Sequence, residues 1–339
     1  MLTTNIFSNI NKKLYGTVFV IALVLTILVN ACSQSQELKT LRVGINNWPG
    51  YTIALYANEA KLFEKRGIKV ELIRFNNQQD SIRATIRGSQ DMSFVPLWEV
   101  MQVDPSNDKP VIVLVTDISA GSDGIVARKG IESIRDLKGK KVGLKLGTVT
   151  HLILLEALKH NQIKPTDIEI YDISNERGAE LLKLGSLDAA VLWEPSLSQT
   201  AQEIGGKVIF TTKDVDSLVI DSLVISANSL QSNKDEITKF ILAWFDAIHA
   251  VETTPEKVFE SISKQIKQPV ETVARDYRGL KKGDIPMNQR MFALKGRLLN
   301  AIQESANLLR EDLRHGRVIR EDIEINSEPL LTAIKNWKP

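Results

Sequence analysis

The residues best suited to bind a small molecule in this sequence are aromatic and polar side chains that directly follow predicted β-strands. Three of the five tryptophans, Trp48, Trp98 and Trp193, occupy such positions. An indole ring at a strand end can form one wall of a pocket while its N–H donates a hydrogen bond to a polar ligand. Alternatively, each ring only fixes its loop to the sheet. The recurrence of three tryptophans at strand ends favours a pocket.

Polar segments accompany these tryptophans at the ends of six predicted strands. In open parallel sheets the carboxyl ends of the strands converge at one edge, where ligands bind. One segment, Gly147-Thr148-Val149-Thr150, opens a predicted helix whose first N–H groups could receive an anion, although a Gly-Thr pair is also typical of plain capping. The segments are residues 46–51, 76–80, 96–99, 145–150, 174–177 and 193–195.

Signatures of catalysis and of metal binding are absent from the sequence. It contains no phosphate-binding or dinucleotide-binding glycine motif, no His-Glu-x-x-His pair and no Gly-x-Ser-x-Gly turn. The acids Glu99, Glu194 and Asp221 lie in separate segments that no spacing rule joins for acid–base chemistry. Each of the four histidines lacks a second metal ligand at suitable spacing. We therefore expect no catalysis, no cofactor and no bound metal.

Two series of alternating strand and helix patterns position the polar segments. Period-two alternation marks the strands, and apolar residues at helical spacing mark the helices between them. The pattern predicts two α/β lobes, each with a mostly parallel sheet and crossover helices. The predicted strands are residues 41–45, 68–75, 92–95, 111–118, 125–128, 142–146, 168–173 and 189–192, and residues 208–211 and the apolar strand 223–226 follow them. The predicted helices are 53–67, 80–88, 151–160 and 176–184.

The last third of the chain, from Leu230 onward, is predicted to be mostly helical. Apolar residues recur there at intervals of three and four, which is typical of helices that bury one face. One apolar stripe contains Ile237, Ile241, Trp244, Ile248 and Val251, and another contains Met291, Leu294, Leu298 and Ile302.

The first 31 residues form a membrane-targeting segment. Lys12 and Lys13 precede 18 uncharged residues, and Cys32 follows them. Residues 29–32, Val-Asn-Ala-Cys, resemble a bacterial lipobox, in which the signal is cut before a cysteine that then carries lipid. We expect a signal peptide over residues 1–31, lipidation of Cys32 and a polar tether over residues 32–39. The alternative is an uncleaved membrane helix, and both place the bulk of the chain outside the cytoplasm.

The charge balance argues against nucleic acid as a partner. The chain carries 43 basic and 41 acidic side chains, and residues 1–31 contribute only the two lysines to this count. The remainder is therefore neutral, whereas binding to nucleic acid generally relies on a basic excess.

Four runs of the sequence resemble the substrate-binding proteins of ABC transporters for nitrate, sulfonate, taurine and bicarbonate. The resemblance covers nearly all of residues 40–339, and its most specific element is Trp-Glu-Pro after Asp-Ala-Ala. The runs are Leu-Arg-Val-Gly with Trp-Pro-Gly-Tyr at 41–44 and 48–51, Leu-Lys-Gly-Lys-Lys-Val-Gly at 137–143, Asp-Ala-Ala-Val-Leu-Trp-Glu-Pro at 188–195 and Val-Ile-Asp-Ser-Leu-Val at 219–224.

The resemblance implies a two-lobed type II periplasmic-binding-protein fold. Lobe 1 is expected to comprise residues 40–125 and 215–339, with the helical C-terminal third packed on it, and lobe 2 residues 126–214. The chain would cross between the lobes twice, and hinge rotation near residues 118–127 and 212–218 would close the cleft on a ligand. Ligand-binding roles are implied for Asn46, Trp48, Tyr51, Trp98, Glu99, Thr148, Trp193, Glu194 and Asp221.

The implied function is that of an extracytoplasmic receptor, anchored to the membrane as a lipoprotein, that delivers a solute to an ABC permease. The solute would be a small sulfonate or taurine-like molecule, or one of the nitrate type. Two alternatives remain: an enzyme of thiamine-pyrimidine synthesis on the same fold, and a ligand-sensing ectodomain. The cysteine-rich iron motif of the enzymes is missing here, which weighs against the first alternative.

Charge near the expected cleft bears on the type of solute. Lys145 and Arg177 face a larger number of acids, so burial of a small inorganic anion there would be unfavourable. A ligand with a cationic as well as an anionic group, of the taurine type, fits better, unless these acids pair with the two cations or point away. The acids are Glu99, Asp117, Asp123, Glu194 and Asp221.

Overall fold

The computed structural model describes residues 37–311 and 319–339. The chain divides into two units, Met1–Leu38 and Lys39–Pro339, and every element below belongs to the second. The predicted signal peptide, the lipobox, Cys32 and the tether as far as residue 36 lie outside the described residues. In the part that the structure describes, no helix combines the length and apolar composition needed to cross a membrane.

The first sheet has the strand order β11-β4-β10-β3-β1-β2, with β12 beside β4. Strand β1 runs parallel to β2 and β3, whereas β10 runs antiparallel to both β3 and β4. The strands are β1 (Thr40–Ile45), β2 (Lys69–Arg74), β3 (Met92–Pro96), β4 (Pro110–Ser119), β10 (Ile220–Ser226), β11 (Leu280–Lys282) and β12 (Glu324–Ile325).

The second sheet has the order β7-β6-β8-β5-β9. Strand β6 is parallel to β7 and β8, and β5 is antiparallel to β8 and β9. Its strands are β5 (Asp123–Ala127), β6 (Lys141–Leu144), β7 (Glu169–Asp172), β8 (Ala189–Trp193) and β9 (Lys207–Thr211).

The two-sheet α/β class is confirmed, and most strands of each sheet point the same way. The exceptions are β10 and β11 in the first sheet and β5 in the second, which run antiparallel to their neighbours. Strands β5 and β10 are each the first to follow a passage of the chain from one sheet to the other, from β4 to β5 and from β9 to β10. Because the chain enters these two strands from the other sheet, no crossover helix of their own sheet sets their direction.

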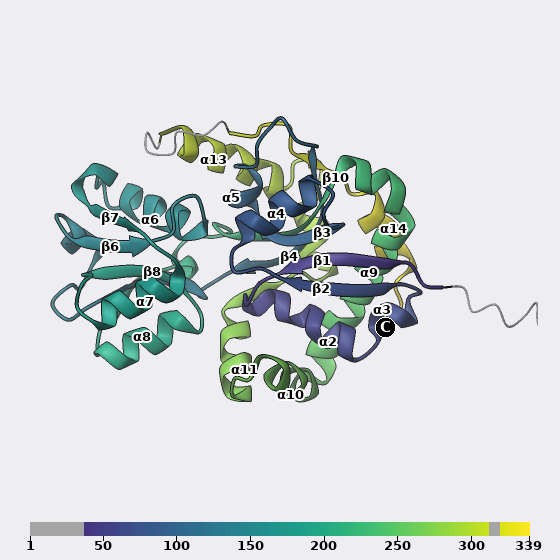
Figure 1. Ribbon diagram of the computed structural model, residues 1–339, viewed down its shortest axis with the longest axis horizontal. Helices are drawn as coiled ribbons and strands as arrows, with labels where there is room; N and C mark the ends of the chain where they lie inside the picture. Colours follow the sequence, from purple (N-terminus) through teal and green to yellow (C-terminus); the bar gives the residue numbers. More distant parts are fainter. Residues whose placement is uncertain (1–36, 312–318) are drawn as a thin grey trace, which may run out of the picture. The chain divides into compact units, whose positions relative to one another are not determined.

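Helices cover both faces of the first sheet because its strands bury alternate residues on opposite sides (Figure 1). In β4, Ile112 belongs to the apolar cluster that contains residues of α4, α5 and α13, whereas Val111 and Val113 belong to the cluster that contains residues of α2, α3, α9, α10 and α14. The helices are α2 (Ile53–Glu59), α3 (Leu62–Lys65), α4 (Gln78–Ile86), α5 (Leu97–Val100), α9 (Ala227–Thr253), α10 (Pro255–Ile266), α11 (Val270–Arg278), α12 (Ile285–Met291), α13 (Arg297–Glu311) and α14 (Glu328–Asn336).

The C-terminal helices pack on the first sheet, as predicted, and a large aromatic contact lies at this junction. Trp244 of α9 lies 5.5 Å, centroid to centroid, from the ring of Phe94 in β3, and its Nε1–H donates to the Gly283 carbonyl at 3.1 Å. This helix therefore packs directly on the sheet that carries one half of the site.

The second sheet is likewise covered on both faces. Ile125 and Ala127 of β5 pack with α6 (Val149–His160), whereas Val126 between them packs with α7 (Asn175–Lys183) and α8 (Ser196–Ile204). Short 3₁₀ helices complete the fold: η1 (Pro49–Thr52), η2 (Ile134–Leu137), η3 (Pro165–Asp167) and η4 (Thr212–Asp214). The residue boundaries of the two lobes stay predictions.

Three local predictions need correction. The helix expected over 53–67 is interrupted at Lys61, whose φ of 55° is left-handed, and so forms α2 and α3. Helix α4 begins at Gln78 instead of Asp80, because the Asn77 side chain accepts the Asp80 N–H at 2.9 Å. Leu294 is fully exposed between α12 and α13 and belongs to no apolar stripe.

Candidate functional site

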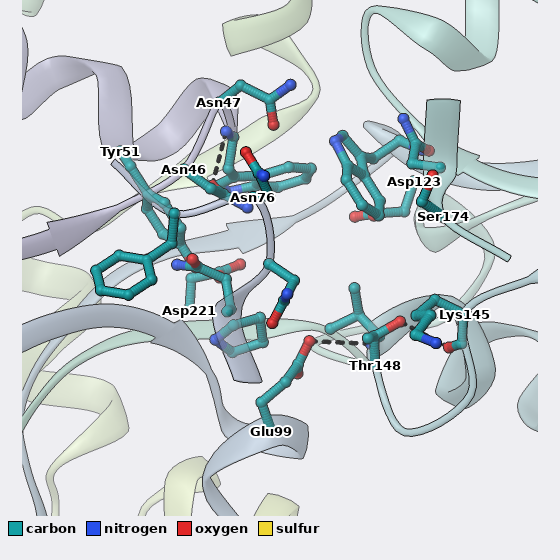
Figure 2. Close-up of a pocket in the computed structure, with 18 of the residues that line it drawn as sticks. Asn46, Asn47, Tyr51, Asn76, Glu99, Asp123, Lys145, Thr148, Ser174 and Asp221 are labelled. Carbon is teal, nitrogen blue, oxygen red and sulfur yellow. Dashed lines mark hydrogen bonds between the residues drawn. The ribbon is translucent and has the colours of Figure 1, made fainter. Parts of the chain in front are cut away.

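A cavity of about 480 Å³ is lined by residues that follow strands of both sheets. Figure 2 shows Asn46, Tyr51, Glu99 and Asp221, which belong to segments of the first sheet, on one side, and Asp123, Ser174, Thr148 and Lys145 on the other. Seven of the nine residues proposed from the sequence line this cavity: Asn46, Trp48, Tyr51, Glu99, Thr148, Trp193 and Asp221.

The structure places the other two residues, Trp98 and Glu194, away from the cavity. Trp98 is 1% exposed and packs edge-on against the His151 ring, with centroids 6.2 Å apart. The Glu194 carboxylate accepts the backbone N–H of Ser198 at 3.1 Å and also the Ser198 hydroxyl, so it caps α8. Both residues follow strands, but Trp98 packs against α6 and Glu194 caps α8. The proposed cation Arg177 pairs with Glu180 at 2.7 Å and does not line the cavity either.

Sequence reasoning missed the cation that does line the cavity, Arg74. It is the last residue of β2 and is exposed, and its side chain forms no ion pair or hydrogen bond with the residues that the structure describes. Its position at the carboxyl end of a parallel strand was the available signal. Lys145 also lines the cavity, but it pairs with Asp172 at 3.0 Å.

Three buried carboxyl groups line the cavity, and a fourth lies directly behind it. Glu99, Asp123 and Asp221 face the cavity, and Asp117, opposite Asp221 in the adjacent strand, accepts the Nε1–H of Trp48 at 2.9 Å. All four are at most 3% exposed. A Cβ on Gly50 would lie 2.1 Å from Asp117 Oδ2, so only glycine lets the η1 backbone approach this carboxyl group.

Burial raises the pKa of every one of these carboxyl groups. Removal from water raises the pKa of Asp117 and of Asp123 to about 7. The pKa of Asp221 is well above its usual value, mainly because of burial and secondly because of the nearby Asp117 charge. The Tyr51 hydroxyl donates a hydrogen bond to Asp221 Oδ1, which lowers this pKa and so opposes the shift. Burial likewise raises the pKa of Glu99 well above its usual value. In the absence of a cation the group therefore retains protons near neutral pH.

The helix terminus predicted to receive an anion already has a protein partner. Glu99 Oε1 accepts the backbone N–H of Val149, the first residue of α6, at 3.3 Å. The Thr148 hydroxyl lies 2.9 Å from the Thr150 hydroxyl and donates to the Lys145 carbonyl at the same distance. Glu99 therefore occupies the position at the helix N-terminus where the sequence predicted that an anionic group of the ligand could bind.

Hydrogen bonds also join the two sides of the cavity at Gly147. Its carbonyl accepts from Gln79 Nε2 at 2.8 Å and from Gln102 Nε2 at 3.0 Å. Together with the bond from Val149 to Glu99, these contacts link α4 and α5 to the loop that precedes α6.

Trp193 is the tryptophan of the second sheet that faces the cavity. It ends β8, is half-buried, and its backbone N–H donates to Asn175 Oδ1 at 3.1 Å. Its Nε1–H has no hydrogen-bond partner among the described residues. With Trp48 and Tyr51 it gives the cavity aromatic walls and leaves one N–H donor available to a ligand.

Comparisons with known proteins agree with this architecture. Residues 48–258 match the family model described as NMT1/THI5 like. The taurine-binding periplasmic protein of Escherichia coli (strain K12) is 26% identical over 257 residues, which is 73% of this chain and 79% of that protein.

Solved structures share the fold. The periplasmic aliphatic sulphonate binding protein SsuA from Escherichia coli has a TM-score of 0.70 and 20% identity, covering 83% of this chain and 95% of that one. The desulfurization enzyme DSZB has a TM-score of 0.62 and 16% identity, covering 88% and 99%. The fold thus occurs in both binding proteins and an enzyme. Since the family model spans well over half of its length, this chain belongs to the NMT1/THI5-like family.

Proposed function

We propose that this protein is the extracytoplasmic solute-binding component of an ABC importer and captures a small solute of the sulfonate, taurine or nitrate type. The observation that carries the proposal is the cavity of about 480 Å³, which takes its lining from both sheets. A cavity of this size suits a small molecule, and it lies where open α/β sheets bind ligands. The taurine-binding and sulphonate-binding relatives support the solute class.

The mechanism that we propose is closure around the solute. Among the described residues, the chain passes between the two sheets at two connections, from β4 to β5 and from β9 to β10, which overlap the predicted hinge segments 118–127 and 212–218. A solute that contacts both sides of the cavity binds the closed form more tightly and so increases its population. The hydrogen bonds that Gly147 accepts from Gln79 and Gln102 belong to this closed form.

Location and partners belong to the same proposal. A receptor of this kind works outside the cytoplasm and delivers its solute to a membrane permease, and a lipid on Cys32 would keep it near that permease. The periplasmic relatives support the location. Binding without turnover is also proposed. The alternative, catalysis on the same fold, predicts that a bound solute is converted, which mass spectrometry of the recovered solute would detect.

Closure gives the first expected result. Small-angle X-ray scattering of the full-length protein is expected to give a smaller radius of gyration with a saturating solute than without it. Thermal-shift screening of 2-aminoethanesulfonate, alkylsulfonates, nitrate, bicarbonate and pyrimidines identifies the solute to use, backed by mass spectrometry of molecules that co-purify. Identical radii with and without a bound solute would contradict closure.

The second expected result concerns removal of the Trp193 indole from the cavity lining. Trp193→Ala is expected to weaken solute binding at least about tenfold, because the indole contributes both contact area and a free N–H donor. Titration calorimetry measures the affinity, and circular dichroism checks that the fold is intact. Trp337→Ala is the matched control, since Trp337 lies at the end of α14, donates to Asp246 at 3.0 Å and does not line the cavity. Unchanged affinity in the Trp193 variant would remove this residue from the site.

A further inference from the structure

Several carboxylate oxygens at the cavity have no hydrogen-bond partner among the described residues. They are Glu99 Oε2, Asp221 Oδ2 and both Oδ atoms of Asp123. Their residues are 3%, 1% and 1% exposed, and all three line the cavity. Buried polar atoms are nearly always paired in folded proteins, and an unpaired buried carboxylate is especially costly. A set of unpaired acceptors that faces a ligand cavity therefore indicates that the ligand supplies the donors.

The protein itself does not neutralise these groups. None of Glu99, Asp117, Asp123 and Asp221 forms a salt bridge with a residue in the described ranges 37–311 and 319–339. Arg74 lines the cavity without an ion pair to any of them, and Lys145 is engaged with Asp172. The positive charge that this cluster lacks must therefore come from protons or from the ligand.

We propose that the cavity selects its solute through a protonated nitrogen group, a primary ammonium or an amidinium, bound between Glu99, Asp123 and Asp221. This inference rests on the proposed function and narrows its solute class. Both cations present several N–H donors, which suit four free carboxylate oxygens that come from three different segments. A second, anionic group on the solute is compatible with the site near Arg74, the exposed cation at the end of β2.

The same geometry disfavours solutes that carry only negative charge. Glu99 Oε1 accepts the N–H of Val149, the first residue of α6, so one of the backbone N–H groups that commonly receive anions is already engaged. Nitrate or an unsubstituted alkylsulfonate supplies no donor to the unpaired carboxyl oxygens, and at a pH where these groups are ionised it is also repelled by them, because water screens charge poorly there. Selection by a cation therefore separates taurine-like solutes from simple anions.

Binding of a cation is coupled to release of protons. Without a ligand, burial raises the pKa of Asp123 to about 7 and holds that of Glu99 and of Asp221 well above its ordinary value, so the cluster holds protons near neutral pH. A bound cation favours the ionised carboxylates and displaces those protons. Affinity for a cation should thus rise from pH 6 to pH 8, by up to about tenfold per pH unit for each proton released. The other titratable and charged groups facing this cluster are Tyr51, Asp117, Glu194, Arg74, Lys145, Glu176 and His151.

The test compares sulfonates with and without a cationic group, and adds two cations that carry no sulfonate. Titration calorimetry of the full-length protein uses 2-aminoethanesulfonate, 2-hydroxyethanesulfonate, ethanesulfonate, ethylamine and benzamidine at pH 6, 7 and 8. We expect at least one cationic probe to bind at least about tenfold more tightly than both non-cationic sulfonates, more tightly at pH 8 than at pH 6, and with release of protons in a comparison of phosphate and Tris buffers.

Each other outcome is decisive. If probes bind but no cationic probe binds at least about tenfold more tightly than both non-cationic sulfonates, the inference is overturned and the proposed function stays in place. No binding by any of the probes overturns the inference and counts against the proposed function as well.

A pair of variants tests the cluster itself. Asp123→Asn preserves the shape of the side chain and is expected to weaken binding of the preferred cationic probe at least tenfold and to reduce proton release. Asp136→Asn makes the same chemical change at an exposed position that does not line the cavity; it is the matched control and should change affinity less than about twofold. Circular dichroism and unfolding in urea show whether each variant is folded, and Glu99→Gln is a second test if Asp123→Asn is not. Wild-type affinity for the cation in a folded variant of either residue overturns the inference.

Discussion

Raising the pH from 5 to 8 is expected to lower the free energy of unfolding of the ligand-free protein by at least about 3 kcal/mol, since each pKa unit between the folded and unfolded states is worth about 1.4 kcal/mol. Burial raises the pKa of Asp117 and Asp123 to about 7, against about 3.9 for an aspartate in an unfolded chain. The folded state thus binds more protons, and stability falls as pH rises. The contribution is fully present below about pH 4 and is lost as the pH rises through about 7.

The pH window separates these groups from the ordinary surface acids. Asp136, for example, accepts N–H groups of Glu132 and Ser133, which lower its pKa, so its contribution is lost only as the pH falls below about 4. Unfolding in urea at pH 5, 6, 7 and 8, followed by circular dichroism, measures the effect. Asp123→Asn is expected to flatten the profile and Asp136→Asn to leave it unchanged over this range. Stability that is constant or rising from pH 5 to 8 would contradict the burial of ionisable groups at the cavity.

The position of the site could be predicted because it depends on a regular feature of the fold. Period-two alternation located the strands, and the rule that ligands bind beyond the carboxyl ends of parallel strands located the cavity. Trp48 and Trp193 illustrate this success, since both follow strands and both line the cavity. Such an argument needs only the direction of each strand and the place where it ends.

Side-chain direction beyond the strand end was not predictable in the same way. Trp98 and Glu99 are neighbours in α5, where successive residues point about 100° apart, so only one of them faces the cavity. Sequence spacing does not tell which one. Arg74 was missed for the related reason that it belongs to the strand itself, where its direction depends on the register with β1.

Contacts between residues far apart in the sequence account for the remaining differences between the sequence predictions and the structure. The sequence correctly indicated that a helix opens near Thr148, and α6 begins at Val149. The group that accepts the Val149 N–H is Glu99, 50 residues earlier and in a segment of the first sheet, which no local pattern reveals. The antiparallel directions of β5 and β10 have the same origin, because they depend on which sheet the chain joins next.

Trp244→Ala is expected to lower the free energy of unfolding by about 3–5 kcal/mol, the usual cost of truncating a large aromatic residue in a core. Trp244 is 1% exposed and lies among aromatic rings at the junction of α9 with the first sheet. Its removal leaves a cavity beside Phe94 and also deprives the Gly283 carbonyl of its 3.1 Å hydrogen bond. Unfolding in urea at a fixed pH of 7 measures the change.

Two further variants separate packing from hydrogen bonding at this junction. Trp244→Phe keeps most of the ring volume but removes the N–H, so it should cost less than the alanine variant, about 1–3 kcal/mol for an unsatisfied buried acceptor together with a small void. Leu331→Ala, on the exposed side of α14, should change stability by no more than about 0.5 kcal/mol. If the alanine variant at 244 were as stable as the Leu331 control, α9 could not depend on this residue to hold the C-terminal helices on the sheet. Because β3 and β10 of that sheet carry Pro96 and Asp221 into the cavity, loss of this packing should also weaken solute binding.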